Sequence, residues 1–165
     1  MNNFVIEQTP EDTKLAVSLH QKAEIGTVRL ARAKIAADSP EESVATPIDV
    51  SMSIKAKRID SRAEQLFIEV TFKLTGTKKN GAARAKNAVC LECGFEISYR
   101  LQPGFQPDDE QVRAFKDGNA IFNCWPYCRE FVHNAMTRMG YPPITLPFLR
   151  VMPTRKKNAS GQRKR

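Results

Sequence analysis

The chain has 165 residues, which is the length of a single domain with its own hydrophobic core. Its composition, with 41% hydrophobic and 27% charged residues, excludes collagen-like, wholly disordered and disulfide-framework proteins. The formal net charge is +8, but seven of the 26 basic residues lie between Arg150 and Arg165, where no residue is acidic. The rest of the chain is therefore close to neutral, and the basic character belongs to a C-terminal tail.

Targeting and redox signals are sparse. No segment approaches the roughly 20 consecutive apolar residues that a membrane helix needs, and the N-terminus lacks the layout of a secretory signal. The chain has only 4 cysteines, which is too few for a disulfide framework. We therefore expect a reducing, cytoplasmic setting.

A short helix is predicted near the N-terminus. Thr9 is a suitable hydroxyl cap, Pro10 suits the first helical position, and acidic residues follow in the first turn. Leu15 and Leu19 are four residues apart and form a thin apolar stripe. The pattern predicts a helix over about residues 10–24, within an N-terminal segment 1–25.

Four segments then alternate apolar and polar residues with the period of a strand. They cover residues 27–35, where the pattern is weak, and then 48–57, 66–75 and 89–101. Because the connections between them are short, we expect neighbouring segments to pair antiparallel. The alternation predicts a four-stranded antiparallel sheet with one apolar and one polar face.

Helical patterns follow the strands. Acidic residues open a helix at Asp108, and Gly118 and Asn119 interrupt it. A longer helix is predicted over about residues 120–139, with one apolar stripe formed by Ile121, Trp125, Cys128, Val132, Ala135 and Met139. The predicted fold is α+β: a four-stranded antiparallel sheet packed by a long C-terminal helix, with a short N-terminal helix. The main domain spans residues 26–149, and a basic, disordered tail covers residues 150–165.

The cysteines allow two interpretations. Cys90 and Cys93, together with Cys124 and Cys128, have the paired spacing that can supply four thiolates to zinc. However, Cys90 and Cys93 lie three apart within a predicted strand, so their side chains point to opposite faces. We favour buried, free cysteines and no metal site.

Catalytic patterns are not apparent. The two histidines, His20 and His133, have neither a nearby nucleophile nor the spacing of metal ligands, and we find no glycine-rich phosphate loop. We therefore expect neither catalysis nor a cofactor. The basic tail is interpreted as a solvated terminus, the alternative being attraction to nucleic acid or an acidic protein.

Aromatic residues on the long helix suggest a binding surface. Phe122, Trp125, Tyr127 and Phe131 are spread too widely around the helix to be buried in one stripe. Some of them must face a partner or a groove, unless all pack in the core of an oligomer.

The long helix and the segment after it resemble the SecB export-chaperone family. The family pattern contains Pro-Tyr-x-Arg-Glu, an arginine at the helix end and a following proline-rich stretch. It is matched here by Pro126, Tyr127, Arg129, Glu130, Arg138 and Pro143. The order of four strands followed by helices also agrees, so the resemblance covers about residues 26–149.

The resemblance implies a non-enzymatic, ATP-independent holdase that assembles as a homotetramer, a dimer of dimers. Its members hold unfolded polypeptides in hydrophobic grooves, and the export members deliver them to SecA. By position, the groove candidates in this sequence are Val50, Met52, Val89, Leu91, Trp125, Leu146 and Phe148. For the strand residues, ordinary core packing is the alternative.

Two departures from the export members concern the partner. Export members end in a second helix and an acidic tail, whereas this chain ends in basic residues, which weighs against SecA. The N-terminal helix leading into Ile25–Leu30 instead resembles SecB-like chaperones that act on the antitoxin of a toxin–antitoxin system. We predict a chaperone of exported proteins, with an antitoxin-dedicated chaperone as the alternative. A zinc-stabilised nucleic-acid-binding protein is a rival of another class.

Overall fold

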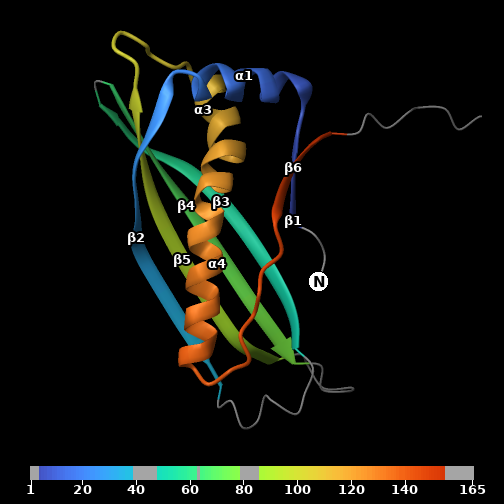
Figure 1. Ribbon diagram of the computed structural model, residues 1–165. Coiled ribbons are helices and arrows are strands. Elements are labelled where there is room, and N and C mark those ends of the chain that lie inside the picture. The colour runs from blue at the N-terminus through green and yellow to red at the C-terminus, as the bar shows by residue number, and fades with distance from the viewer. Residues whose placement is uncertain (1–3, 39–47, 63, 79–85, 155–165) are drawn as a thin grey trace, which may run out of the picture.

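A computed structural model of the chain describes residues 4–38, 48–62, 64–78 and 86–154. Four long strands form one sheet, and a long helix lies along one of its faces (Figure 1). The strands are β2 (Ala23–Ala37), β3 (Ile48–Arg62), β4 (Gln65–Lys78) and β5 (Lys86–Leu101). All neighbouring strands are antiparallel, which confirms the predicted α+β class.

The order of the strands differs from the one that short connections favour. The order is β2-β5-β4-β3, so β2 pairs with β5 and not with β3. Strands β2 and β3 form the two opposite edges of the sheet. On β5, Ile97 and Phe95 face the same side as their β2 partners Val28 and Leu30. Strand β2 thus extends the apolar face of the sheet beside β5. Connection length alone cannot reveal a partner that lies about 60 residues further along the chain.

The N-terminal helix is confirmed, but it is shorter than predicted. Helix α1 spans Pro10–His20, and the Thr9 hydroxyl accepts a hydrogen bond of 3.0 Å from the backbone N–H of Asp12. It ends before residue 24 because Ala23 already pairs with Leu101 in the sheet.

The C-terminal helices form one nearly continuous rod. Helix α3 (Asp109–Phe115) leads into a π-helical turn, η1 (Lys116–Ala120), and then into α4 (Ile121–Arg138). The interruption predicted at Gly118 is therefore a wide helical turn and not a loop. A Cβ atom at Gly118 would overlap the side-chain amide of Gln8, so only glycine leaves room for that contact.

The core lies between the inner face of the sheet and the buried stripe of α4. Strands β4 and β5 contribute alternate residues from Leu66 to Leu74 and from Val89 to Leu101, all nearly inaccessible to solvent. From α4, the buried residues are Ile121, Cys124, Trp125, Cys128, Val132, Ala135 and Met136. Strand residues that recur at every second position and helix residues that recur about every 3.6 positions thus form one buried layer.

A second, two-stranded sheet joins the two ends of the described chain. Strand β1 (Phe4–Gln8) runs parallel to β6 (Leu149–Pro153), with Phe4 beside Leu149 and Gln8 beside Pro153. Neither strand was predicted. The tail expected from residue 150 therefore includes Arg150–Pro153 of β6, which are in a strand and not disordered. The part of that tail from residue 155 onward lies outside the described residues.

Candidate functional site

Large apolar side chains that remain exposed gather on the helix-covered side of the sheet and at its edges. Within the described part of the chain, such residues come from β2 (Ile25, Leu30 and Ile35), from α4 (Phe122 and Tyr127) and from the β1–β6 region (Val5, Phe148, Val151 and Met152). Val17 of α1 and Ile59 of β3 stand apart from these groups. Helix α4 divides this surface into two flanks.

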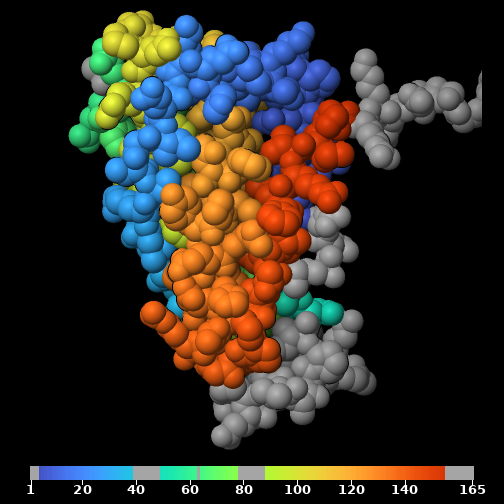
Figure 2. Space-filling model, viewed as in Figure 1, coloured from blue at the N-terminus to red at the C-terminus, as the bar shows by residue number. Residues whose placement is uncertain are grey.

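The flank of α4 beside β2 is open. A hollow of about 300 Å³ lies here, lined by Leu30, Ile35, Glu130, Phe131, Asn134, Ala135 and Arg138. We call these seven residues the open groove. Its floor is formed by apolar side chains, and its charged and amide groups are those of Glu130, Asn134 and Arg138 on α4. Figure 2 shows this stretch of α4 uncovered beside β2.

The open groove exists because β2 is an edge strand that extends beyond the helix. Leu30 pairs with Phe95 and Ile35 pairs with Leu91, whose side chains are both buried in the core. Leu30 and Ile35 therefore point to the apolar side of the sheet, yet each remains 45% exposed. A register shift between Leu30 and Arg32 keeps both residues on this side although they are five positions apart.

Tyr127 extends the apolar floor of the same flank. Its ring centroid lies 6.2 Å from that of Phe95 at the inner face of β5, while the side chain remains about half exposed. Phe131 follows one turn later on the same side of α4, as the spacing of four residues requires. Large apolar and aromatic groups from both α4 and β2 therefore lie on this flank.

The opposite flank of α4 is covered by the extended segment that precedes β6. The Trp125 indole Nε1–H donates to the carbonyl of Pro147 at 3.1 Å, and Arg129 Nε–H donates to the carbonyl of Leu146 at 2.9 Å. The Arg129 guanidinium also lies 4.8 Å from the centroid of the Phe148 ring. Two side chains of one helix thus satisfy consecutive backbone carbonyls and hold the segment in place.

The predicted groove residues fall into three situations. Val89, Leu91, Trp125 and Leu146 are buried in the core of the chain. Val50 and Met52 of β3 are partly buried against the same core. Phe148 is 74% exposed. Arg129 contacts both Leu146 and Phe148, and Trp125 binds the carbonyl of Pro147 between them, whereas Val89 and Leu91 lie in the core.

The six family-pattern residues divide between the two flanks and the end of the helix. Tyr127, Glu130 and Arg138 lie beside β2, and Arg129 binds the covering segment. The Glu130 carboxylate accepts a hydrogen bond from the Asn134 side chain. Pro126 lies inside α4, and Pro143 follows its end; both are exposed. The pattern thus combines groove-lining and segment-holding roles.

Three of the four cysteines are buried together. A hydrogen bond with Cys93 and burial raise the pKa of the Cys128 thiol, and burial raises the pKa of Cys124 to about 12. Cys90 pairs with Thr75 on the polar face, opposite to Cys93, so the four thiols do not converge. Among the residues that the structure describes, no group of three His, Cys, Asp or Glu side chains is placed to hold a metal ion.

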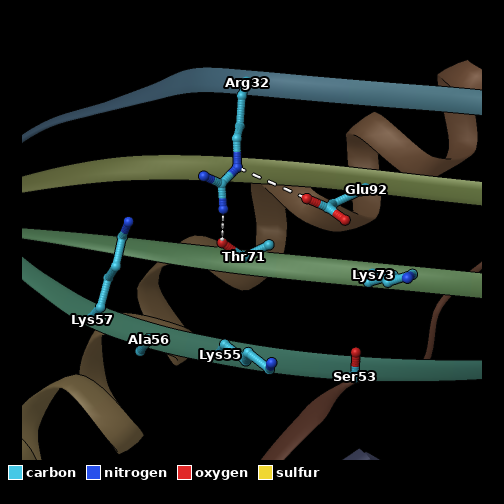
Figure 3. A pocket seen from close by; sticks show the side chains of 8 residues that line it. All are labelled: Arg32, Ser53, Lys55, Ala56, Lys57, Thr71, Lys73 and Glu92. Atoms are coloured by element: carbon cyan, nitrogen blue, oxygen red, sulfur yellow. Dashed lines mark hydrogen bonds and ion pairs between the residues drawn. The ribbon is translucent and has the colours of Figure 1, made fainter.

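The outer face of the sheet is a network of ion pairs. Glu69, which is buried, accepts from Arg32 at 2.7 Å and from Lys57 at 3.0 Å. The Arg32 side chain reaches Thr71 by crossing β5 at Gly94, where a Cβ atom would lie 2.9 Å from Arg32 Cγ. A hollow of about 470 Å³ lies here, lined by Arg32, Ser53, Lys55, Ala56, Lys57, Thr71, Lys73 and Glu92 (Figure 3). Basic groups outnumber acidic ones around it.

The open groove and the β1–β6 pair were both missed by sequence reasoning. Leu30 and Ile35 lay in the weakest of the four predicted strands, and the register shift after Leu30 moves Ile35 out of the alternation. Phe4 and Ile6 alternate with polar or exposed neighbours over only five residues, too few to indicate a strand. A search for an apolar residue out of phase in an edge strand could have found Ile35.

No helix in the described residues is both long and apolar enough to cross a membrane. No family model matches the chain. Two curated proteins of Mycobacterium tuberculosis, the SecB-like chaperone Rv1957 of strain H37Rv and the SecB-like chaperone MT2006 of strain CDC 1551, are each 25% identical to it over 154 residues. The match covers 85% of this chain and 85% of each relative.

A solved structure shows the same fold. It is the Mycobacterium tuberculosis Rv1957 SecB-like chaperone in complex with a ChAD peptide from the Rv1956 HigA1 antitoxin. The TM-score is 0.69 at 20% sequence identity, and the match covers 84% of this chain and 99% of the solved chain. In sequence and in fold, this chain is therefore similar to SecB-like chaperones.

Proposed function

We propose that this chain is an ATP-independent chaperone that holds a non-native polypeptide, and that its dedicated client is the antitoxin of a toxin–antitoxin system. The observation that carries the proposal is the open groove, an apolar surface left uncovered on a chain whose relatives are SecB-like chaperones. The antitoxin is favoured over exported precursors because the solved relative is in complex with an antitoxin peptide.

The open groove suits a ligand without fixed structure. Unfolded chains expose apolar side chains, and each that enters the groove loses contact with water at a gain of about 25 cal/mol per Å². Glu130, Asn134 and Arg138 along the groove can pair with the polar groups of a bound backbone. Affinity then depends on buried apolar area and not on one sequence, so binding needs no nucleotide and no chemical step.

The groove residues inferred from the family resemblance stay predictions. Phe148 is the candidate among them that is already accessible, and it lies in the segment whose backbone carbonyls accept hydrogen bonds from Trp125 and Arg129. For Val50 and Met52 at the β3 side, we propose contact with a client segment that continues beyond this flank.

We also propose the homotetramer. Strand β2 is 15 residues long and lies at one edge of the sheet, and such an edge is a template for pairing with another chain. Mass measurement of the purified protein by native mass spectrometry tests this, with four copies expected and a monomer contradicting it. The cytoplasmic location expected from the free cysteines stays a prediction.

The client is tested through the genes that flank this one. If they encode a toxin–antitoxin pair, the antitoxin should be degraded or aggregate when made alone and persist when made with this chain. Its half-life in growing cells, measured with the wild-type chaperone and with a groove variant, is the assay. An antitoxin that is equally stable without the chaperone contradicts the antitoxin proposal, while suppression of aggregation of a denatured protein tests holding activity by itself.

Delivery of exported proteins to SecA is the second family role, and the outer face argues against it. Lys55, Lys57 and Lys73 make this face more basic than acidic, whereas SecA docking is expected on an acidic sheet surface. The zinc-binding alternative is opposed by Cys90, which lies on the other face of the sheet from the remaining thiols.

A further inference from the structure

Strand β1 binds against three separate parts of the chain: β6, Trp125 of α4, and the turn around Ala114 and Gly118. We call this binding site the seat of β1. The backbone of β1 pairs with β6, and the ladder continues beyond it because Thr154 N–H donates to the Gln8 carbonyl at 2.8 Å. The Phe4 ring lies 5.2 Å from the Trp125 ring, and Trp125 in turn lies 5.9 Å from Phe72 of the core. Strands β1 and β6 run side by side next to α4 (Figure 1).

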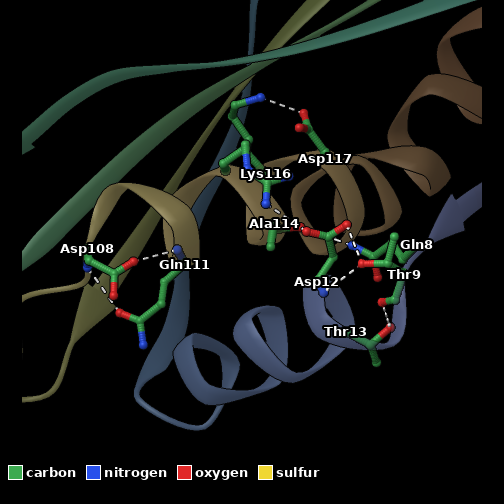
Figure 4. A network of polar contacts seen from close by, with 10 residues as sticks. Gln8, Thr9, Asp12, Thr13, Asp108, Gln111, Ala114, Lys116 and Asp117 are labelled. Carbon is green, nitrogen blue, oxygen red and sulfur yellow. Dashed lines mark hydrogen bonds and ion pairs between the residues drawn. The ribbon is translucent and has the colours of Figure 1, made fainter.

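The far end of β1 is held by a specific polar contact. The side-chain amide of Gln8 is buried and donates to the carbonyl of Ala114 at 3.0 Å (Figure 4). Gly118 in the π-helical turn leaves the space that this amide occupies. The seat therefore accepts an aromatic residue, an aliphatic residue two positions later and an amide at the fifth position of an extended chain.

The same strand is only lightly attached. It has five residues, lies at the N-terminal end of the described chain and belongs to a sheet of just two strands. Phe4 and Ile6 are only partly buried, and Val5 and Glu7 are exposed. A two-stranded pair of this kind is marginally stable and opens locally at low cost.

We infer that the seat of β1 is a second polypeptide-binding site, and that β1 is a built-in competitor which a client segment displaces. The ligand is an extended segment of the pattern aromatic-x-aliphatic-x-amide, which adds to β6 by strand pairing and places its aromatic ring on Trp125. This inference rests on the proposed function, since it supplies a site for a client that the open groove also engages.

Competition within the chain has a measurable consequence. A binding site that is free in only a fraction of molecules shows an affinity reduced by that fraction. If β1 occupies its seat in about nine of ten molecules, removing it raises the affinity for a displacing segment about tenfold. The gain appears without any new contact to the ligand.

The experiment compares the full chain with a chain that begins at Thr9, which keeps the cap of α1. The first probe is a fluorescein-labelled peptide with the sequence Asn2–Thr9 of this chain, followed by anisotropy. We expect the shortened chain to bind it about tenfold more tightly than the full chain. Replacing Phe4→Ser in the peptide should weaken its binding to the shortened chain, whereas Val5→Ser, at an exposed position, should leave that binding unchanged.

A second probe, reduced and carboxymethylated α-lactalbumin, stands for an unfolded client. It should displace the peptide from the shortened chain and bind that chain more tightly than the full chain. Because a shortened chain can lose stability, the full-length Phe4→Ser variant is measured too and should show the same gain. Equal client affinity in all three chains overturns this inference alone. Absence of client binding in all of them overturns the chaperone proposal and this inference together.

Discussion

Replacing Leu30 and Ile35 by serine should weaken client binding through the open groove. Each side chain is 45% exposed in the folded chain. Complete burial of a leucine or isoleucine contributes about 1.5–3 kcal/mol, so covering the exposed part contributes about 1 kcal/mol per residue. The double variant should lose about 2 kcal/mol of binding free energy, which is about a thirtyfold increase in Kd.

The matched control is the double variant Val17→Ser with Ile59→Ser. These side chains are 45% and 46% exposed, so the folded chain loses a similar amount of packing, but they lie on α1 and β3 away from the groove. The assay is the anisotropy of labelled, reduced and carboxymethylated α-lactalbumin, with thermal unfolding recorded for every variant. The control should bind like the wild type.

Two outcomes would refute this reasoning. Equal weakening in both double variants would show that binding follows stability and not the groove. A groove variant that binds the client normally but falls apart into smaller oligomers by light scattering would show that Leu30 and Ile35 form a subunit interface. In that case the surface would be a structural contact, and the open groove would not be the client site.

Three further predictions concern other parts of the molecule. Cys90 should react first with a thiol reagent in the native protein, because Cys93, Cys124 and Cys128 are buried and the last two have raised pKa values. The release of chromophore with time should show one fast thiol, and two fast thiols would contradict the described packing. Asp12 has a lowered pKa because it accepts hydrogen bonds from Thr9 and Arg113, so its stabilising effect is present above its ordinary pKa of about 4 and is lost as the pH falls below it. The melting temperature should therefore fall less for Asp12→Asn than for the wild type when the pH is lowered from about 6 to about 3, a range that brackets this pKa. Parallel curves of melting temperature against pH would disprove the linkage. In Arg129→Lys, the lysine cannot make both the hydrogen bond to Leu146 and the contact with the Phe148 ring, so the free energy of unfolding should fall by about 1–2 kcal/mol. Urea unfolding measures this change. An unchanged midpoint would show that the covering segment is held by other contacts.

Much of the fold could be predicted because its periodicities are clean. In β4 and β5 every second residue, from Leu66 to Leu74 and from Val89 to Leu101, is apolar and buried, and the stripe of α4 recurs at steps of three and four. Such patterns determine which face of each element is buried, and one layer of helix on one face of a sheet follows from them. The same alternation placed Cys90 and Cys93 on opposite faces before the structure showed it.

The binding surfaces could be predicted only in part. The resemblance pointed to Leu146 and Phe148, which lie in the segment that Trp125 and Arg129 bind, and to Val89 and Leu91, which are buried in the core; their role in binding stays a prediction. The open groove depends on a register shift at Leu30 and on how far β2 extends past the helix. Neither quantity is encoded in a short stretch of sequence.

The amino-acid sequence by itself determined the four long strands, the helices, their buried faces and the family pattern on α4. Only the tertiary structure decided that β2 pairs with β5, that β1 pairs with β6, and that Gln8 fits against Gly118. The reason is physical: the face of a strand or helix follows from residues a few positions apart, whereas its partner is chosen by the burial and backbone pairing of segments about 50 to 145 residues away. Surfaces made by such distant pairings exist only once the chain has folded.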